Sequence, residues 1–176
     1  MSVMGEAAPS SVARLMVSGN VPVLCSPTSG STFPLGTTTV NCSAKDAAGN
    51  VGTASFKIAV QDTTPPTIAS VTPSEDTLWP PNHKMVPMSV NVAVNDAVDA
   101  APACRVAAIV SNEPVNGLGD GDTTPDWTIG NGLTFQLRAE RSGKGPGRVY
   151  TITVECRDFS GNRSTKTTTV TEKSLF

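Results

Sequence analysis

The side chains best suited to hold an ion lie in one glycine-rich stretch, residues 112–126. The oxygen-bearing side chains in it are Asn112, Glu113, Asn116, Asp120, Asp122 and Asp126. Gly117, Gly119 and Gly121 let the backbone curl around a centre. Because Ca²⁺ takes roughly six to eight hard oxygen ligands, the stretch predicts a calcium site, although its spacing is not that of an EF-hand.

Two other interpretations of this stretch need no ion. Asp, Asn and Gly are ordinary turn residues. If residues 141–148 lie at the same end of a β-sandwich, Arg141, Lys144 and Arg148 pair with the carboxylates instead. Exposed pairs of this kind add little stability. The sequence therefore leaves calcium, ion pairs and plain turns open.

A D-x-x-G-N motif occurs twice, beginning at Asp46 and at Asp158. We expect each aspartate to cap its own turn, because an Asp side chain readily accepts hydrogen bonds from nearby backbone N–H groups. A second interpretation is an interdomain ion shared by Asp62, Asp158 and the loop 96–99.

The chain shows no catalytic apparatus. His83 is its one histidine, it lies in a proline-rich loop, and no nucleophile motif such as G-x-S-x-G accompanies it. Glu113 with Asp120 or Asp122 resembles a hydrolase acid–base pair, but no apolar wall is present to raise one pKa. We therefore predict that the protein is not an enzyme.

Three aromatic residues suggest an alternative function. Trp79, Trp127 and Tyr150 would form a sugar-stacking platform if they were exposed together. The chain would then be a carbohydrate-binding accessory module of a secreted hydrolase. In a chain with only 5% aromatic residues, they equally suit the role of core side chains, with Trp127 anchoring the strand after the acidic stretch.

Four cysteines divide evenly between the two halves of the chain. No pair has C-x-x-C spacing, which argues against a zinc site. Small β modules commonly carry disulfides in oxidising compartments. We predict the bridges Cys25–Cys42 and Cys104–Cys156, each within one half.

Composition excludes several function classes. The net charge is −2 and no basic run occurs, so nucleic-acid binding is disfavoured. No apolar run is long enough for membrane insertion, and residues 1–11 lack the pattern of a signal peptide. Abundant Thr, Ser, Val, Gly and Pro favour strands and turns over helices.

The alternating pattern predicts an all-β chain of two modules. The expected strands are residues 21–25, 37–45, 54–60, 67–71, 85–94, 104–110, 133–139, 149–156 and 164–170, with a weaker one at 12–17. Pro65 and Pro66 make residues 63–66 a stiff hinge. The predicted domains are therefore residues 1–62 and 67–176.

The two D-x-x-G-N turns also indicate a weak internal repeat. Aligning them pairs Val40 with Ile152, Cys42 with Val154, and Ala44 with Cys156. Both modules then end in a hairpin of the same design. The cysteines do not coincide, so each module carries its own bridge.

Residues 25–66 resemble the C-terminal half of a hyalin-repeat (HYR) domain, through the run CSPTSGSTFPLGTTTVNCSAKDAAGNVGTASFKIAVQDTTPP. The resemblance implies an immunoglobulin-like β-sandwich in an extracellular, often adhesive, multi-module protein. Residues 1–19 do not continue the pattern, so we expect the first module to be N-terminally incomplete.

Residues 67–171 resemble an immunoglobulin-like module that recurs in long bacterial surface and secreted proteins. The segments that carry this resemblance are 78–84, 111–114, 119–127 and 138–143. It implies two tandem immunoglobulin-like β-sandwich modules.

We therefore predict a non-enzymatic spacer or adhesion element of a secreted or cell-surface protein, stiffened by Ca²⁺ if the acidic stretch binds it. Its expected partners are neighbouring modules of a longer chain and a protein or glycan surface ligand.

Overall fold

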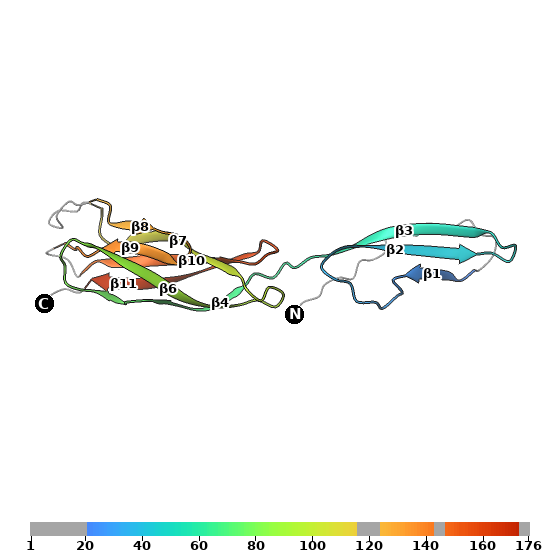
Figure 1. The fold of residues 1–176 in the computed structure, drawn as a ribbon, viewed down its shortest axis with the longest axis horizontal. Helices are drawn as coiled ribbons and strands as arrows, with labels where there is room; N and C mark the ends of the chain where they lie inside the picture. Colours follow the sequence, from blue (N-terminus) through green and yellow to red (C-terminus); the bar gives the residue numbers. More distant parts are fainter. Residues whose placement is uncertain (1–20, 116–123, 143–146, 173–176) are drawn as a thin grey trace. The chain divides into compact units, whose positions relative to one another are not determined.

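The computed structural model describes residues 21–115, 124–142 and 147–172, all in strands, turns and loops (Figure 1). The chain divides into two compact units, Met1–Asp62 and Thr63–Phe176. The all-β prediction is confirmed for the described residues. Within those ranges no helix is long and apolar enough to cross a membrane.

The described part of the first unit is one antiparallel sheet in the order β1-β2-β3. Its strands are β1 (Val23–Ser26), β2 (Gly36–Lys45) and β3 (Val51–Val60). Val40 and Ala44 of β2 are buried, as the period-2 pattern predicts. By contrast, Val23 and Phe56 on the neighbouring strands are 55% and 49% exposed.

The second unit contains two four-stranded sheets. One has the order β4-β6-β9-β8, with β4 (Thr67–Pro73), β6 (Met85–Asn95), β9 (Thr134–Arg138) and β8 (Trp127–Ile129). The other has the order β5-β11-β10-β7, with β5 (Thr77–Leu78), β11 (Arg163–Glu172), β10 (Val149–Arg157) and β7 (Ala103–Ser111). Neighbouring strands are antiparallel except β5, which pairs with the end of β11 in parallel.

Both sheets of the second unit contribute to one hydrophobic core. The first sheet supplies Ile68, Met88, Val90, Phe135 and Leu137, and the second supplies Leu78, Val106, Ile109, Tyr150, Ile152, Val154, Cys156 and Val170. Alternate residues of β10 point into this core, which follows from the two-residue period of a strand. The core fixes both sheets, and the loops at their ends position the polar side chains considered below.

Both predicted disulfides are present and join equivalent strands. Cys25 of β1 faces Cys42 of β2, and Cys104 of β7 faces Cys156 of β10. In each unit the bridge ties the first strand of the final hairpin, β2 or β10, to its neighbour on the other side, β1 or β7. This shared arrangement supports the internal repeat.

Most of the predicted strands occur within a few residues of their expected bounds. The periodicity did not reveal β5, which has two residues and no alternation to detect. The strand β8 was anticipated only through Trp127, the residue with which it begins. The predicted strand at 12–17 lies outside the described residues.

Candidate functional site

A cluster of buried charged side chains lies at one end of the second unit. Five loops and strand ends bring it together: the loop after β7, the residue before β8, the end of β9 with the segment after it, the start of β10 and the end of β11. The members of this arginine–carboxylate cluster are Glu113, Asp126, Arg138, Glu140, Arg148, Tyr150 and Glu172, all buried. Buried charges are uncommon unless they are paired, so the cluster is the most unusual feature of the fold.

Arg148, which precedes β10, is the centre of this cluster. Its guanidinium pairs with Asp126, lies 3.4 Å from a Glu113 oxygen and lies 3.8 Å from a Glu140 oxygen. Burial acts to lower the pKa of Arg148, but its interactions with Tyr150 and Asp126 outweigh burial and raise that pKa. Arg148 therefore stays charged and holds the carboxylates around it.

Arg138 fastens the cluster to the backbone. Its guanidinium donates to the Pro125 carbonyl at 2.8 and 3.0 Å and to the His83 carbonyl at 2.8 Å. The Tyr150 hydroxyl donates to the Arg138 carbonyl at 2.8 Å. Burial raises the pKa of Tyr150 to about 12, so the hydroxyl keeps its proton. Three separate segments are thereby tied to one arginine.

Glu140 connects the cluster to the one histidine. His83 Nδ1 lies 3.2 Å from Glu140 Oε2, and the His83 backbone N–H donates to the Ala139 carbonyl at 2.8 Å. His83 has a φ of 60°, a left-handed conformation that is uncommon outside glycine. Burial raises the pKa of Glu140, and the nearby Asp126 charge adds to that effect while His83 opposes it.

The structure describes three of the six residues of the predicted calcium stretch: Asn112, Glu113 and Asp126. The Asn112 side chain accepts from the Val149 N–H at 2.7 Å and donates to the Gly147 carbonyl at 3.2 Å. Glu113 accepts from the Ser142 N–H at 2.7 Å. The described ends of the acidic stretch and of residues 141–148 therefore lie together and form ion pairs through Arg148.

The other three predicted ligands, Asn116, Asp120 and Asp122, lie outside the described residues, as does Lys144. The calcium site remains a prediction. The expected contact between Arg148 and the carboxylates occurs, but in a buried position rather than on the surface.

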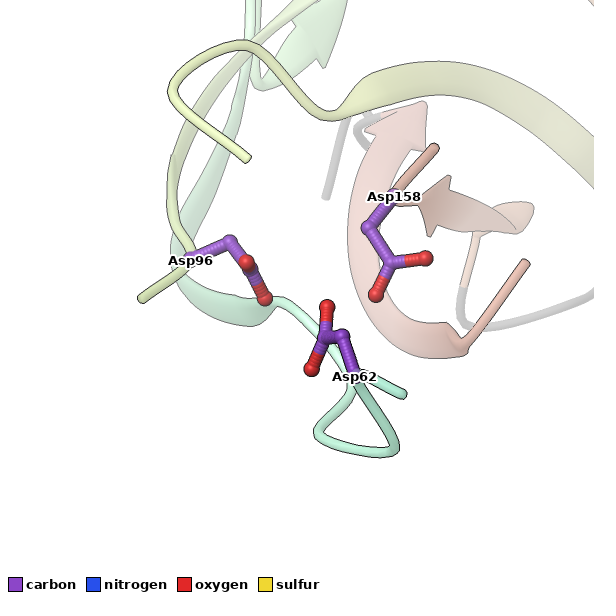
Figure 2. A group of neighbouring side chains, drawn as sticks. All are labelled: Asp62, Asp96 and Asp158. Carbon is purple, nitrogen blue, oxygen red and sulfur yellow. The ribbon is translucent and has the colours of Figure 1, made fainter. Parts of the chain in front are cut away.

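Asp96 and Asp158 of the second unit form an aspartate group. A carboxylate oxygen of Asp96 and one of Asp158 lie within 4.8 Å of each other. Figure 2 shows both carboxylates directed into the space between them, and hard carboxylate oxygens at this spacing suit a cation such as Ca²⁺. The interdomain ion expected from the sequence at Asp62, Asp158 and the loop 96–99 stays a prediction.

Asp96 and Asp158 also organise their own loops. Asp158 accepts from the Asn162 backbone and side-chain N–H groups at 2.8 Å each, and Asp46 makes the same pair of bonds to Asn50. Asp96 accepts from two successive backbone N–H groups at 2.8 Å each. The predicted turn caps are therefore present in both units.

The three aromatic residues do not share one exposed surface. Tyr150 is fully buried, Trp127 packs edge-on against it with ring centroids 6.2 Å apart, and Trp79 is 56% exposed. A sugar-stacking platform made of all three is therefore wrong.

With this geometry in view, the comparison with known families concerns the first unit. Residues 10–60 match the family model of the HYR domain. The HYR domain belongs to a family of extracellular, adhesion-associated and non-enzymatic modules. The match begins at residue 10, before the segment 25–66 that carries the resemblance in the sequence, because residues 10–19 show no clean alternation. No curated protein matches the chain.

Proposed function

We propose that this chain is a pair of immunoglobulin-like modules that serves as a spacer or adhesion element in a secreted or cell-surface multi-module protein. The observation that carries the proposal is the HYR match at residues 10–60. The disulfides add support, because bridges of this kind persist in oxidising, extracellular compartments. The partners are neighbouring modules, together with a protein or glycan ligand on a cell surface.

The strand order of the second unit supports the immunoglobulin-like part of the proposal. Its sheets β4-β6-β9-β8 and β7-β10-β11 correspond to the two sheets of a seven-stranded sandwich of that type, with the short β5 added beside β11. The first unit repeats the arrangement β7-β10-β11 as β1-β2-β3. Each unit then places its disulfide between the same two strands of the fold.

Stretching single molecules of the full chain tests a mechanical role. Cys25–Cys42 and Cys104–Cys156 close loops with separations of 17 and 52 residues, which cannot extend while the bridges are intact. At about 3.5 Å per residue, reduction should lengthen the fully unfolded chain by roughly 60 Å and roughly 180 Å for the two units. Unfolding at the same low force before and after reduction would contradict a mechanical function.

Calcium stiffening is the finer part of the proposal. The candidate ligands are the predicted stretch 112–126 and the aspartate group of Figure 2. Thermal unfolding with Ca²⁺ and with EDTA at fixed ionic strength measures the effect. A ligand at about 100 times its dissociation constant, bound only to the folded state, adds roughly 2.7 kcal/mol.

Two variants assign the calcium effect to one place. Asp120→Asn with Asp122→Asn removes charge from the predicted stretch, and Asp96→Asn removes it from the aspartate group. Asn at position 96 keeps a side-chain oxygen for the bonds to the Val98 and Asp99 N–H groups. The variant that abolishes the calcium shift identifies the site, and an unchanged melting temperature of the unmodified chain with millimolar Ca²⁺ would remove calcium from the proposal.

A further inference from the structure

Glu172 is a buried carboxyl group that no hydrogen bond from the described residues satisfies. It ends β11, is 0% exposed, and neither of its carboxylate oxygens has a hydrogen-bond partner within the described ranges. Its backbone N–H donates to the Arg148 carbonyl at 2.8 Å, which keeps the side chain inside the arginine–carboxylate cluster. An ionised carboxylate without hydrogen bonds is costly to bury, whereas a neutral carboxyl costs much less.

The charges around Glu172 come from every neighbouring element. Arg148 and Tyr150 lie at the start of β10, Glu140 and Arg141 follow β9, and Glu113 follows β7. Arg141 and Arg148 favour the ionised form of Glu172, while Glu113 and Glu140 oppose it. β5, paired with the end of β11, contributes the buried Leu78 and no charged side chain.

Carboxylates outnumber arginines in this cluster. Its four acids are Glu113, Asp126, Glu140 and Glu172, and its two arginines are Arg138 and Arg148. Counting the half-buried Arg141 still leaves one more carboxylate than arginines, four against three. Burial raises the pKa of Glu172 to about 7, and it acts more strongly than the two arginines that oppose it. A proton on Glu172 therefore balances the excess charge.

A divalent cation fits this cluster less well than a proton does. No three acids of the cluster bring carboxylate oxygens within 4.8 Å of one another, as far as the described residues show. Arg148 already occupies the centre that such an ion would need. Glu113, Glu140 and Asp126 each also have one oxygen without a hydrogen bond among the described residues, and the one buried arginine donor without a partner there, Arg141 Nε, makes no hydrogen bond to Glu172.

We propose that Glu172 is a proton-dependent latch for the end of β11. With a neutral carboxyl, Glu172 completes the buried cluster and holds the final residues of β11 in place. When the carboxyl is ionised, a charge is buried without a hydrogen bond, and the strand end opens more often. The two-residue strand β5 opens with it, because Thr171 and Glu172 are the partners of Thr77 and Leu78.

The direction of the pH effect follows from linkage. The pKa of Glu172 is raised in the folded chain from an ordinary value of 4.5 to about 7. Its contribution to stability is thus complete below about pH 4.5 and is lost as the pH rises toward 7. Between these values the opening equilibrium increases about tenfold per pH unit, and it levels off above pH 7.

The first experiment measures the titration of Glu172 directly. Carbon-13 NMR of the glutamate carboxyl groups in the full chain, assigned with Glu172→Gln, gives its pKa without depending on how a variant folds. We expect a midpoint near 7 that is the same with Ca²⁺ and with EDTA. A midpoint at or below 4.5 overturns the latch, and so does a midpoint that Ca²⁺ lowers, because Glu172 would then be a cation ligand.

The second experiment measures opening of the strand end. Native-state hydrogen exchange compares the Thr171 and Glu172 amides, which donate to the Asp76 and Arg148 carbonyls, with the Thr168 amide, which faces Ile152 of β10 in the middle of β11. After correction for intrinsic exchange, we expect protection at the end to fall about tenfold per pH unit from about pH 5 to 7. Protection at Thr168 should fall less.

Matched variants separate Glu172 from the other titrating groups. Glu172→Gln should make protection at the strand end independent of pH, whereas Glu155→Gln on the exposed face of β10 should behave like the unmodified chain. The series is repeated with His83→Gln, which removes the one histidine. An unchanged pH slope in Glu172→Gln, or a slope abolished by His83→Gln alone, overturns the proposal.

Discussion

The two units share one design and differ in what surrounds it. The sheet β1-β2-β3 and the strands β7-β10-β11 have the same order, a disulfide between the same two strands at shifted positions, and the same D-x-x-G-N hairpin. In the part of the chain that the structure describes, a second sheet is present in the second unit, where it closes the core over β10. Among the described residues of the first unit, burial of large apolar groups is limited to β2.

The arginine–carboxylate cluster belongs to the second unit alone. Aligning the two hairpins places Gly36 at the position of Arg148, Thr38 at that of Tyr150, and Val60 at that of Glu172. None of the three residues in the first unit carries a charge. The shared framework of strands therefore does not require the cluster, and the aligned positions of the first unit lack its charges. The strand order and the turns are common to both units, whereas the buried arginines and carboxylates are particular to the second.

The largest expected difference comes from Arg148. Arg148→Met leaves Glu113 and Asp126 buried without their partner, and breaking a buried pair in this way costs about 3–5 kcal/mol. The loss should be confined to the second unit. Both tryptophans lie after residue 62, so tryptophan fluorescence during denaturant unfolding reports that unit.

An exposed arginine provides the control for Arg148. Arg105→Met removes a pair with Glu155 on the surface of the same sheet, where such pairs contribute little. Adding Glu113→Gln and Asp126→Asn to Arg148→Met should recover part of the lost stability. Equal effects of Arg105→Met and Arg148→Met would mean that burial of the cluster does not matter energetically.

The disulfides should affect the two units unequally. By loop-closure entropy, removing Cys25–Cys42 costs about 3 kcal/mol and removing Cys104–Cys156 about 4 kcal/mol, given separations of 17 and 52 residues. Because its described core is smaller, the first unit should lose its cooperative transition, while the second unit stays folded at a lower melting temperature. Calorimetry of paired Cys→Ala variants measures this. A first unit that survives loss of its bridge would contradict our account of the difference.

Much of the fold could be predicted because period-2 alternation and turn chemistry act locally. Val40 and Ala44 alternate with polar neighbours, and Asp158 precedes the glycine that its turn requires. Gly49 and Gly161 adopt φ values of 91° and 99°, which explains the glycine in both hairpin motifs. Such signals need no knowledge of distant contacts.

The cluster could be predicted only in part. Arg148 was expected to pair with carboxylates of the acidic stretch. The cluster members Glu140 and Glu172, however, gave no local sequence signal. They are separated from Glu113 by 27 and 59 residues in sequence and meet only when both sheets have formed. An isolated glutamate near a strand end normally indicates solvent exposure, and burial depends on the surrounding tertiary structure.

A smaller effect is expected at Tyr150. Tyr150→Phe removes the hydrogen bond to the Arg138 carbonyl and the contact with Arg148, while it keeps the edge-on packing against Trp127. A loss of about 1–2 kcal/mol is expected, because the buried carbonyl loses a donor. Denaturant unfolding followed by tryptophan fluorescence measures it. A neutral result would show that Arg138 and Arg148 need no help from the hydroxyl group.

The smallest expected effect concerns the D-x-x-G-N turns of the two units at low pH. Hydrogen bonds from Asn50 lower the pKa of Asp46, and bonds from Asn162 lower that of Asp158 although burial opposes them. A lowered folded pKa gives stability that is present above the ordinary value of 3.8 and is lost as the pH falls below it. Asp46→Asn and Asp158→Asn should therefore each flatten the acid limb of unfolding.

The two turn variants should differ near neutral pH. Asp46→Asn only weakens its turn, whereas Asp158→Asn also removes a charge beside Asp96 and relieves repulsion between carboxylates. In EDTA we expect Asp158→Asn to cost less stability than Asp46→Asn, as measured by calorimetry. Added Ca²⁺ should reverse that order if the aspartate group binds the ion, because Asp158→Asn then loses a ligand. An order that is the same in EDTA and Ca²⁺ would leave the two turns with a purely structural role.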